Sequence, residues 1–404
     1  MERRRMKNKK ILPIILFLFI LSMVFIPGCN NKGENLNDTI HGLHFASVSP
    51  SGLMAYTKGY LEYFDFKGGE PTVMCGRPDC NHQPYDSVTN PDPQCPATFP
   101  KGTNPIAAII REGYLYLFVK PSEFNKAHIY KSDLDGENRR KIAELDILGF
   151  RDDFILAGDY LVFTGLEMVQ KDSGEGLGLV QNFSTDIFIG ILDWNTFEIV
   201  FKDPIEKTST STNFYIFDNI LYYMFREFEP SENKDIFEIR QIDLNNFEKK
   251  ESILLPKDSS GEYLNCIFKE SYAYYLDGND LYRFSLKDKE KKLYIPSLDI
   301  EASSTLIGIT GDYFFIFSYP EDADLDEDYI ITVFNEKTKH LQVIDMTYSG
   351  VETLIYPKLF NFDPDDKHII LAYQVPGQSI SFRYIKIEDL LNKSFDFVDF
   401  YYYK

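Results

Sequence analysis

The chain has few tryptophan, cysteine and histidine residues. Its 404 residues include one tryptophan, five cysteines and six histidines. Five of the histidines are scattered and offer no cluster for a metal-dependent lyase: His41, His44, His128, His340 and His368. The sequence also lacks a G-x-S-x-G nucleophile elbow and a phosphate-binding loop. These absences argue against an α/β-hydrolase and against a P-loop nucleotide-binding protein.

Basic residues are also scarce outside the N-terminus. The chain contains 42 lysines and arginines against 62 aspartates and glutamates, which gives a net charge of −20. Residues 1–28 carry six basic residues and one acidic residue, so their net charge is +5 and the remainder carries −25. A strongly negative surface repels phosphate backbones and anionic lipid headgroups. We therefore expect no nucleic-acid partner.

The N-terminus has the layout of a secretory signal. A basic stretch, Met1–Lys10, precedes the uncharged apolar run Ile11–Ile26. This run is short for a membrane span, which needs about 20 apolar residues. The segment that follows, Ile26-Pro27-Gly28-Cys29, resembles the bacterial lipobox, although proline is unusual at its position. The resemblance implies cleavage before Cys29 and a diacylglyceryl thioether on its sulfur. An uncleaved signal anchor and plain secretion are the alternatives.

The expected domain organisation follows from this start. Residues 1–28 form the signal peptide, residues 29–43 form the lipidated cysteine and a tether, and residues 44–404 form the folded domain. The polar composition of NNKGENLND after Cys29 is typical of a flexible tether. Two or three acyl chains hold a protein stably on a membrane, whereas one chain does not. We therefore expect a lipid-anchored protein on the extracytoplasmic face of the cell membrane.

The folded domain is predicted to be all β. Its 34 phenylalanines and 27 tyrosines favour pleated, half-buried surfaces. Outside the signal peptide we find no amphipathic helix of about ten residues or more, the length at which a helix can be told from a buried strand. The best helical candidate is the short segment 387–393, with one or two turns.

A weak four-strand repeat runs along this domain. One unit has strands at 106–110, 114–119, 129–134 and 141–145, with Asp135-Gly136 as a hairpin turn. The same order recurs in seven sets, and in several of them Gly-Asp, Glu-Gly or Asp-Asn precedes a second strand rich in Tyr and Phe. Four-stranded units repeated about 40–60 residues apart are the signature of a β-propeller. We predict seven four-stranded blades, with six or eight as possible counts.

Two phrases of the sequence carry a family resemblance. Residues 113–116 (GYLY) and 129–138 (IYKSDLDGEN) resemble TolB-like and WD40-like propeller repeats. They are also similar to the propeller domain of lipoproteins that are common in Gram-positive anaerobes. The resemblance covers most of residues 44–400 and implies architecture, not function. The partner role of TolB is not carried over, because its additional N-terminal domain is not evident here.

The most specific chemistry lies in a Cys-rich loop at residues 75–100. Cys75, Cys80, His82 and Cys95 form the pattern C-x4-C-x-H-x12-C in a proline-rich segment, which predicts a loop without a strand ladder. Three thiolates and an imidazole can supply four tetrahedral ligands to Zn²⁺. The alternative is a disulfide between two of these cysteines, since exported proteins usually oxidise their thiols. The fifth cysteine, Cys266, begins an apolar strand and is expected to be a buried small hydrophobe.

The functional hypothesis rests on this architecture. A propeller presents loops that commonly carry binding, so we expect a non-enzymatic, monomeric protein that binds a protein or saccharide ligand. Its other contact is the lipid membrane, through the acyl chains on Cys29. One alternative is a carbohydrate-active enzyme, a glycosidase or lyase, which would need convergent carboxylates or a histidine–metal site. Another is an accessory subunit of an export or sensory complex. No catalytic residue can be assigned.

Lipidation of Cys29 can be tested directly. Metabolic labelling with a palmitate analogue is expected to mark the wild-type protein and to leave the Cys29→Ser variant unmarked, because the thioether needs that sulfur. The Cys266→Ser variant serves as a control that should keep its label. Label that survives in Cys29→Ser would reject the lipobox interpretation.

Overall fold

The computed structural model describes residues 40–402 except for gaps in the connections, the longest being 172–181, 256–264, 319–329 and 347–358. The described residues belong to one compact unit, Thr39–Lys404. The predicted signal peptide, Cys29 and most of the tether lie outside the described residues. No helix in the described part is long and apolar enough to cross a membrane.

Strands dominate the described part of the chain, as predicted. In the first half the strands are β1 (Ile40–Leu43), β2 (Ala46–Ser49), β3 (Gly52–Thr57), β4 (Tyr60–Asp65), β5 (Thr72–Val73), β6 (Pro105–Arg111), β7 (Tyr114–Val119), β8 (Ala127–Asp133), β9 (Arg140–Leu145), β10 (Gly149–Ala157), β11 (Tyr160–Lys171), β12 (Asn182–Asp193) and β13 (Glu198–Ile205).

The second half repeats this layout. Its strands are β14 (Ser209–Phe217), β15 (Ile220–Glu229), β16 (Lys234–Asp243), β17 (Glu248–Leu254), β18 (Ile267–Lys269), β19 (Tyr272–Asp277), β20 (Asp280–Ser285), β21 (Lys291–Ile295), β22 (Thr305–Thr310), β23 (Tyr313–Ser318), β24 (Ile330–Asn335), β25 (His340–Asp345), β26 (Leu359–Phe360), β27 (His368–Gln374), β28 (Ile380–Lys386) and β29 (Val398–Tyr402). The predicted short helix is confirmed as α2 (Ile387–Leu391).

These strands form six hydrogen-bonded sheets, so the predicted count of seven separate blades is wrong. Five sheets have four strands each, and one has nine, in the order β13-β12-β11-β10-β1-β2-β3-β4-β5. The nine-stranded sheet contains two of the predicted four-strand sets, β2–β5 and β10–β13. Strand β1 joins them, because it pairs antiparallel with both β10 and β2. The architecture is an all-β propeller.

Strand β1 is formed by residues that the sequence assigned to the tether. A strand of four residues is only about 13 Å long, at about 3.3 Å per residue. It is too short to show a clear alternation of apolar and polar residues in the sequence. Its place is fixed by contacts distant in sequence instead. Ile40 is buried among Ala107 and Ile109 of β6 and Phe154 and Leu156 of β10. Packing against β6 and pairing with β10 therefore draw residues 40–43 into the propeller.

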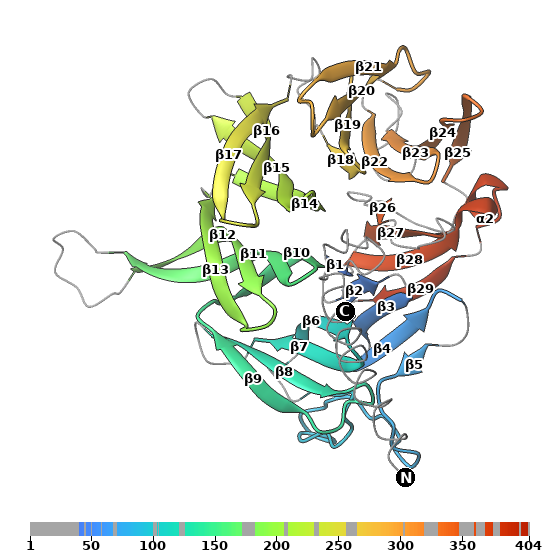
Figure 1. Cartoon of the computed structure of the whole chain (residues 1–404). Coiled ribbons are helices and arrows are strands. Elements are labelled where there is room, and N and C mark those ends of the chain that lie inside the picture. The colour runs from blue at the N-terminus through green and yellow to red at the C-terminus, as the bar shows by residue number, and fades with distance from the viewer. Residues whose placement is uncertain are drawn as a thin grey trace, which may run out of the picture. The chain divides into compact units, whose positions relative to one another are not determined.

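The strand sets follow one another around a common centre (Figure 1). The first strand of each set faces this centre, and β2 lies against β6, β10 against β14, β14 against β18, β18 against β22, and β22 against β26. The last set meets the first through β29 and β3. At that junction the rings of Phe66 and Tyr384 pack edge to face with centroids 6.0 Å apart. Among the described strands, side-chain packing closes this junction, because β26–β29 make a sheet of their own.

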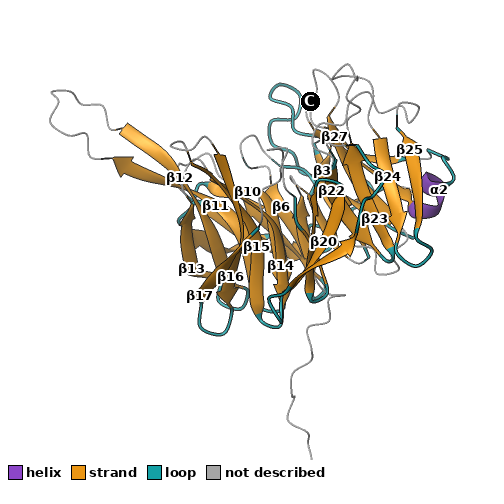
Figure 2. Ribbon diagram, turned by 90° about the horizontal axis from the view of Figure 1, so that it is seen from above, coloured by secondary structure: helices purple, strands orange, loops and turns teal. Residues whose placement is uncertain are grey.

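The hairpin turns explain why the repeat is regular. Antiparallel order places the first and third turns of a set at the same end of its strands, and the short turns gather at one end in Figure 2. In four sets a backbone N–H of the third turn donates a hydrogen bond to a carbonyl of the first turn: Trp194 to Asp159, Leu244 to Asn219, Leu286 to Ser271 and Glu336 to Asp312, at 2.8–2.9 Å. The predicted Gly-Asp and Asp-Asn turns are therefore confirmed, and each accepts a bond that ties its own set together.

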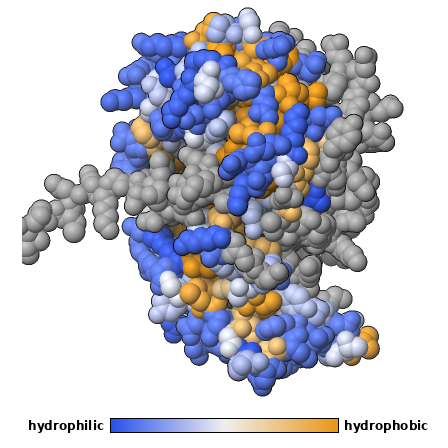
Figure 3. Space-filling view, turned by 90° about the vertical axis from the view of Figure 1, so that its right-hand side faces the viewer, coloured by the Kyte–Doolittle hydropathy of each residue, from blue (hydrophilic) through white to orange (hydrophobic). Residues whose placement is uncertain are grey.

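The core lies between neighbouring sets. Phe118, Phe163 and Phe188, for example, are fully buried in a cluster that spans β7, β11 and β12. Figure 3 shows one side of the molecule, on which hydrophilic atoms cover much of the described surface and hydrophobic atoms gather in narrow zones between them. Each sheet therefore buries its apolar side chains against the next sheet.

Candidate metal centre

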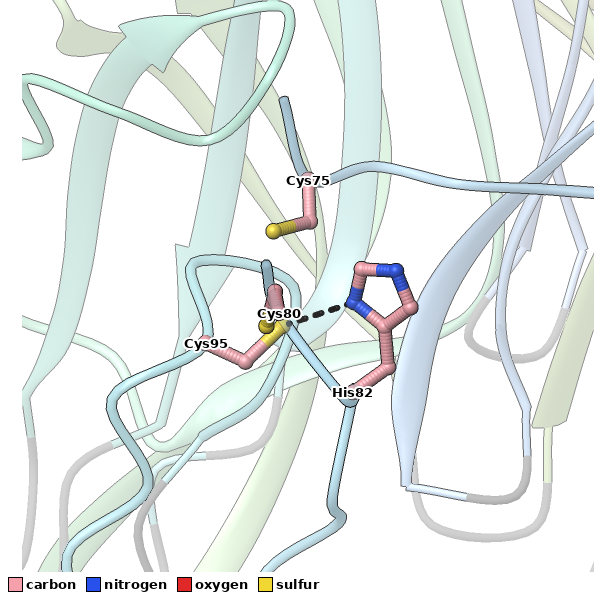
Figure 4. Close-up of side chains that lie close together, drawn as sticks. All are labelled: Cys75, Cys80, His82 and Cys95. Carbon is pink, nitrogen blue, oxygen red and sulfur yellow. Dashed lines mark hydrogen bonds between the residues drawn. The ribbon is translucent and has the colours of Figure 1, made fainter. Parts of the chain in front are cut away.

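The structure brings the four predicted ligands together. Cys75, Cys80, His82 and Cys95 lie in the connection from β5 to β6, and their ligand atoms are all within 4.8 Å of one another. In Figure 4 the three sulfur atoms and the imidazole face a common point, and 3.5 Å separates Cys95 Sγ from His82 Nδ1. These residues lie close enough to hold a metal ion.

The spacing fits a small tetrahedral ion. With metal–sulfur bonds of about 2.3 Å and metal–nitrogen bonds of about 2.0 Å, tetrahedral angles place sulfurs about 3.8 Å apart and a sulfur and a nitrogen about 3.5 Å apart. The observed distance from Cys95 Sγ to His82 Nδ1 equals the second value, and the 4.8 Å limit of the whole set requires only a small contraction. Sulfur and imidazole donors are also the kind that zinc prefers.

Backbone amides point at all three sulfurs. The N–H groups of Arg77, His82 and Ala97 donate hydrogen bonds to Cys75, Cys80 and Cys95 respectively, always from the residue two positions further on. Such bonds stabilise a thiolate more than a thiol, because the acceptor carries the charge. To make this local turn, His82 takes a positive φ of 48°. The backbone thus directs one N–H group at each of the three sulfurs.

The thiols differ in how readily they ionise. Burial raises the pKa of Cys95 to about 12, and burial also raises the pKa of Cys75. For Cys80 burial acts in the same direction, but hydrogen bonds from the His82 amide and the other thiols outweigh it, so its pKa lies below the usual value. A divalent cation at the common point would favour the thiolate form of all three, since ligating thiols lose their protons.

The loop around the ligands has almost no strand ladder, as predicted. Its one bridge among described residues joins Asp86 and Asn90. Side chains close the same turn: the Asp86 carboxylate accepts the N–H groups of Val88 and Thr89 at 2.9 and 2.6 Å. Asn90 donates to the carbonyl of Pro84 at 2.8 Å. Local polar contacts shape this turn, and the four converging ligands connect its two ends.

The inner half of the loop is packed between the first two strand sets, β2–β5 and β6–β9. Met74, Cys95, Ala97 and Phe99 are buried in one apolar cluster with residues of β3, β4, β6 and β7. The carbonyl of Ala97 accepts a hydrogen bond from the Leu61 N–H at 2.8 Å. The ligand Cys95 is therefore rooted in the core, while the segment with Cys75, Cys80 and His82 lies over it.

The hairpin from β8 to β9 supports the loop from the other side. This connection has six residues, Leu134–Arg139, and contains the predicted turn at Asp135-Gly136, where Gly136 has a φ of 79°. Glu137 forms a two-pronged ion pair with Arg77, at 2.5 and 3.2 Å, and Arg77 also donates to the carbonyl of Gln94 at 2.8 Å. The hairpin therefore contacts the Cys-rich loop through this ion pair.

Arg77 and Arg139 were missed by the sequence analysis. Arg139 donates a hydrogen bond to the carbonyl of Pro96, and its guanidinium carbon lies 4.4 Å from the centroid of the Phe99 ring. Their partners Glu137 and Pro96 are 60 and 43 positions away in the sequence. Only the presence of Arg77 between two predicted ligands gave a signal.

All four described cysteines are unpaired, and Cys266 is buried as predicted. Cys75, Cys80, Cys95 and Cys266 are free thiols in the structure. Cys266 is fully buried beside Ala273 and Tyr275, as predicted, and burial raises its pKa. The disulfide alternative for the loop stays a prediction for oxidised protein.

Comparison with known proteins adds the fold alone. No protein-family description and no curated protein matches the sequence. Among solved structures, the β-propeller domain of the trilobed protease from Pyrococcus furiosus is 11% identical with a TM-score of 0.40, over 72% of this chain and 83% of that one. A putative 6-phosphogluconolactonase from Bacteroides fragilis is 13% identical with a TM-score of 0.40, over 92% and 95%. An oligogalacturonate lyase in complex with manganese is 10% identical with a TM-score of 0.40, over 69% and 72%.

Two glycines test the contact between hairpin and loop. Gly136 has φ +79°, and an added Cβ would lie 2.7 Å from Pro96 Cβ; Gly113 has φ +76° with open space around it. Gly113→Ala is expected to lower the free energy of unfolding by about 1–2 kcal/mol through backbone strain alone. Gly136→Ala should cost about 1–3 kcal/mol more, through overpacking. Denaturant unfolding measures both. Equal losses would show that the hairpin does not press on the loop.

Proposed function

We propose that this chain is a lipid-anchored, extracytoplasmic β-propeller that binds a ligand or protein partner and carries a structural zinc centre. One observation carries the proposal: four ligand atoms, three sulfurs and one imidazole nitrogen, lie within 4.8 Å of one another. Structural zinc sites use four protein ligands, whereas catalytic sites keep one position for water or substrate. A complete protein ligand set supports a structural role.

The kind of donor supports zinc among the divalent ions. Thiolates and imidazoles bind zinc well, whereas magnesium, calcium and manganese prefer carboxylate, carbonyl and water oxygens. The four-residue set contains no oxygen donor. The manganese of the oligogalacturonate lyase is therefore not transferred to this site.

The proposed role of the centre is to fasten the first two strand sets together. Cys95 belongs to the apolar cluster between these sets, and Cys75 lies two residues after the end of β5 of the first set. A cross-link that closes a loop of about 20 residues contributes on the order of 3 kcal/mol in the chain-entropy view. The metal thus stabilises a segment whose prolines prevent it from forming a ladder.

A long β-ribbon supports the proposed binding role. Strands β11 and β12 pair along their whole length, from Tyr160–Asp193 to Lys171–Asn182, and extend away from the neighbouring strands in Figures 1 and 2. Strand β10 pairs with β11 as far as Leu166, and β13 pairs with β12 as far as Ile187. Beyond these points the described ribbon has backbone edges to which a partner strand could add.

The one fully buried carboxylate among the described residues is paired and not free to act on a substrate. Glycosidases need two carboxyl groups that face the substrate. Asp203 is the one fully buried carboxylate among the described residues, and it is held by Lys249 at 2.5 Å and by the Tyr223 hydroxyl at 3.2 Å. Its charge is used to join β13, β15 and β17, which is a structural role.

Elemental analysis of protein purified without oxygen tests the metal centre. Wild-type protein is expected to contain about one zinc per chain, because one tetrahedral ligand set binds one ion. His82→Ala and Cys80→Ser should lose most of that zinc. The matched control Cys266→Ala removes a cysteine outside the set and should keep it. Removing zinc with a chelator should lower the free energy of unfolding by at least about 3 kcal/mol.

The opposing result is equally specific. Metal-free wild-type protein with one disulfide by mass, and unaltered stability of His82→Ala, would reject the zinc centre and leave the disulfide alternative.

A further inference from the structure

Arg139 occupies an unusual position beside the proposed metal centre. It ends the β8–β9 hairpin and directs its side chain under the loop, where one guanidinium nitrogen donates to the carbonyl of Pro96. Its guanidinium carbon lies 4.4 Å from the centroid of Phe99. Pro96 and Phe99 follow the ligand Cys95 in the sequence, so the guanidinium is held against the backbone that carries this ligand.

This cation has no carboxylate partner among the described residues. The Nε atom of Arg139 is buried and has no hydrogen-bond partner. Burial lowers the pKa of Arg139, while attraction to Cys95, Tyr130 and Glu137 acts in the opposite direction. Glu137 is the one carboxylate among these three residues, and it is already paired with Arg77 at 2.5 Å. Arg139 as a whole is partly buried. A desolvated cation without a counter-ion is costly, and partners for such groups are the rule.

The charge of the proposed centre supplies the counter-ion that Arg139 lacks. Three thiolates carry −3, a divalent ion carries +2 and a neutral imidazole carries no charge, so the loaded centre carries −1. We propose that Arg139 is the counter-cation of this anionic centre and thereby favours its tris-thiolate, divalent form. The inference rests on the proposed metal centre and adds a positioning residue that touches no metal. A trivalent ion would leave the centre neutral and remove this attraction.

The inference separates Arg139 from its neighbour in the sequence. Arg140 has the same side chain, lies next to it at the start of β9 and is exposed to solvent. Replacing either arginine by glutamine changes the net charge of the protein equally. Only Arg139→Gln, however, removes a cation that is desolvated beside the ligand Cys95, where charge interactions are strong. Arg140→Gln is therefore the matched control.

The test measures zinc and cobalt(II) dissociation constants by chelator competition for the full-length wild-type protein and three variants. Arg139→Gln is expected to weaken binding of both ions by about 10–100-fold, the usual effect of losing a group that supports metal ligands. Arg140→Gln should bind within about twofold of wild type, because exposed charges are screened by water and salt. Arg139→Lys keeps the charge and should recover most of the affinity.

Thermal unfolding of the metal-free proteins distinguishes charge compensation from ordinary packing. Metal-free Arg139→Gln is expected to unfold within a few degrees of metal-free wild type, while the increase that zinc produces becomes smaller. The inference is overturned if Arg139→Gln and Arg140→Gln bind zinc equally tightly. It is also overturned if Arg139→Gln loses as much stability without metal as with it. Absence of zinc binding in the wild type would instead reject the metal centre itself.

Discussion

The convergence of three sulfurs and one imidazole is the interaction on which the first part of this propeller depends. The segment between β5 and β6 is rich in proline and makes one isolated bridge among its described residues. Ordering such a segment costs conformational entropy of about 1–2 kcal/mol per residue. Apolar burial of Ala97 and Phe99 offsets part of this cost, and only at the inner end of the loop. At the outer end of the loop, the proposed metal centre would offset the rest of this cost.

Polar and charged groups of opposite sign surround the four converging side chains. Backbone amides face the sulfurs, and Arg77 and Glu137 join loop and hairpin. The partly buried Arg139 donates a hydrogen bond to the carbonyl of Pro96, the residue after Cys95. The same hairpin that completes the second strand set thus supports the loop that leaves the first. The proposed metal binding, the order of the loop and the contact between the two sets are therefore linked, because each uses the same few residues.

Sequence patterns predicted the local features well. The turn signals before Tyr160 and Tyr313, the short helix at Ile387 and the ligand spacing of the Cys-rich loop all depend on neighbours in the chain. Features that depend on distant partners were not predictable. Strand β1 is four residues long and gains its place from β10, more than 100 residues later, so the joined nine-stranded sheet could not be anticipated. Arg139 likewise has its partner Pro96 in the connection from β5 to β6, 43 positions earlier in the sequence.

X-ray absorption at the zinc edge of the intact protein tests the central claim most directly, because it counts the atoms bound to the metal. Three sulfurs at about 2.3 Å and one nitrogen at about 2.0 Å are predicted, as in structural Cys₃His sites. A shell of oxygen and nitrogen alone, or a shell with fewer than three sulfurs, would contradict the assignment of Cys75, Cys80, His82 and Cys95 as one centre.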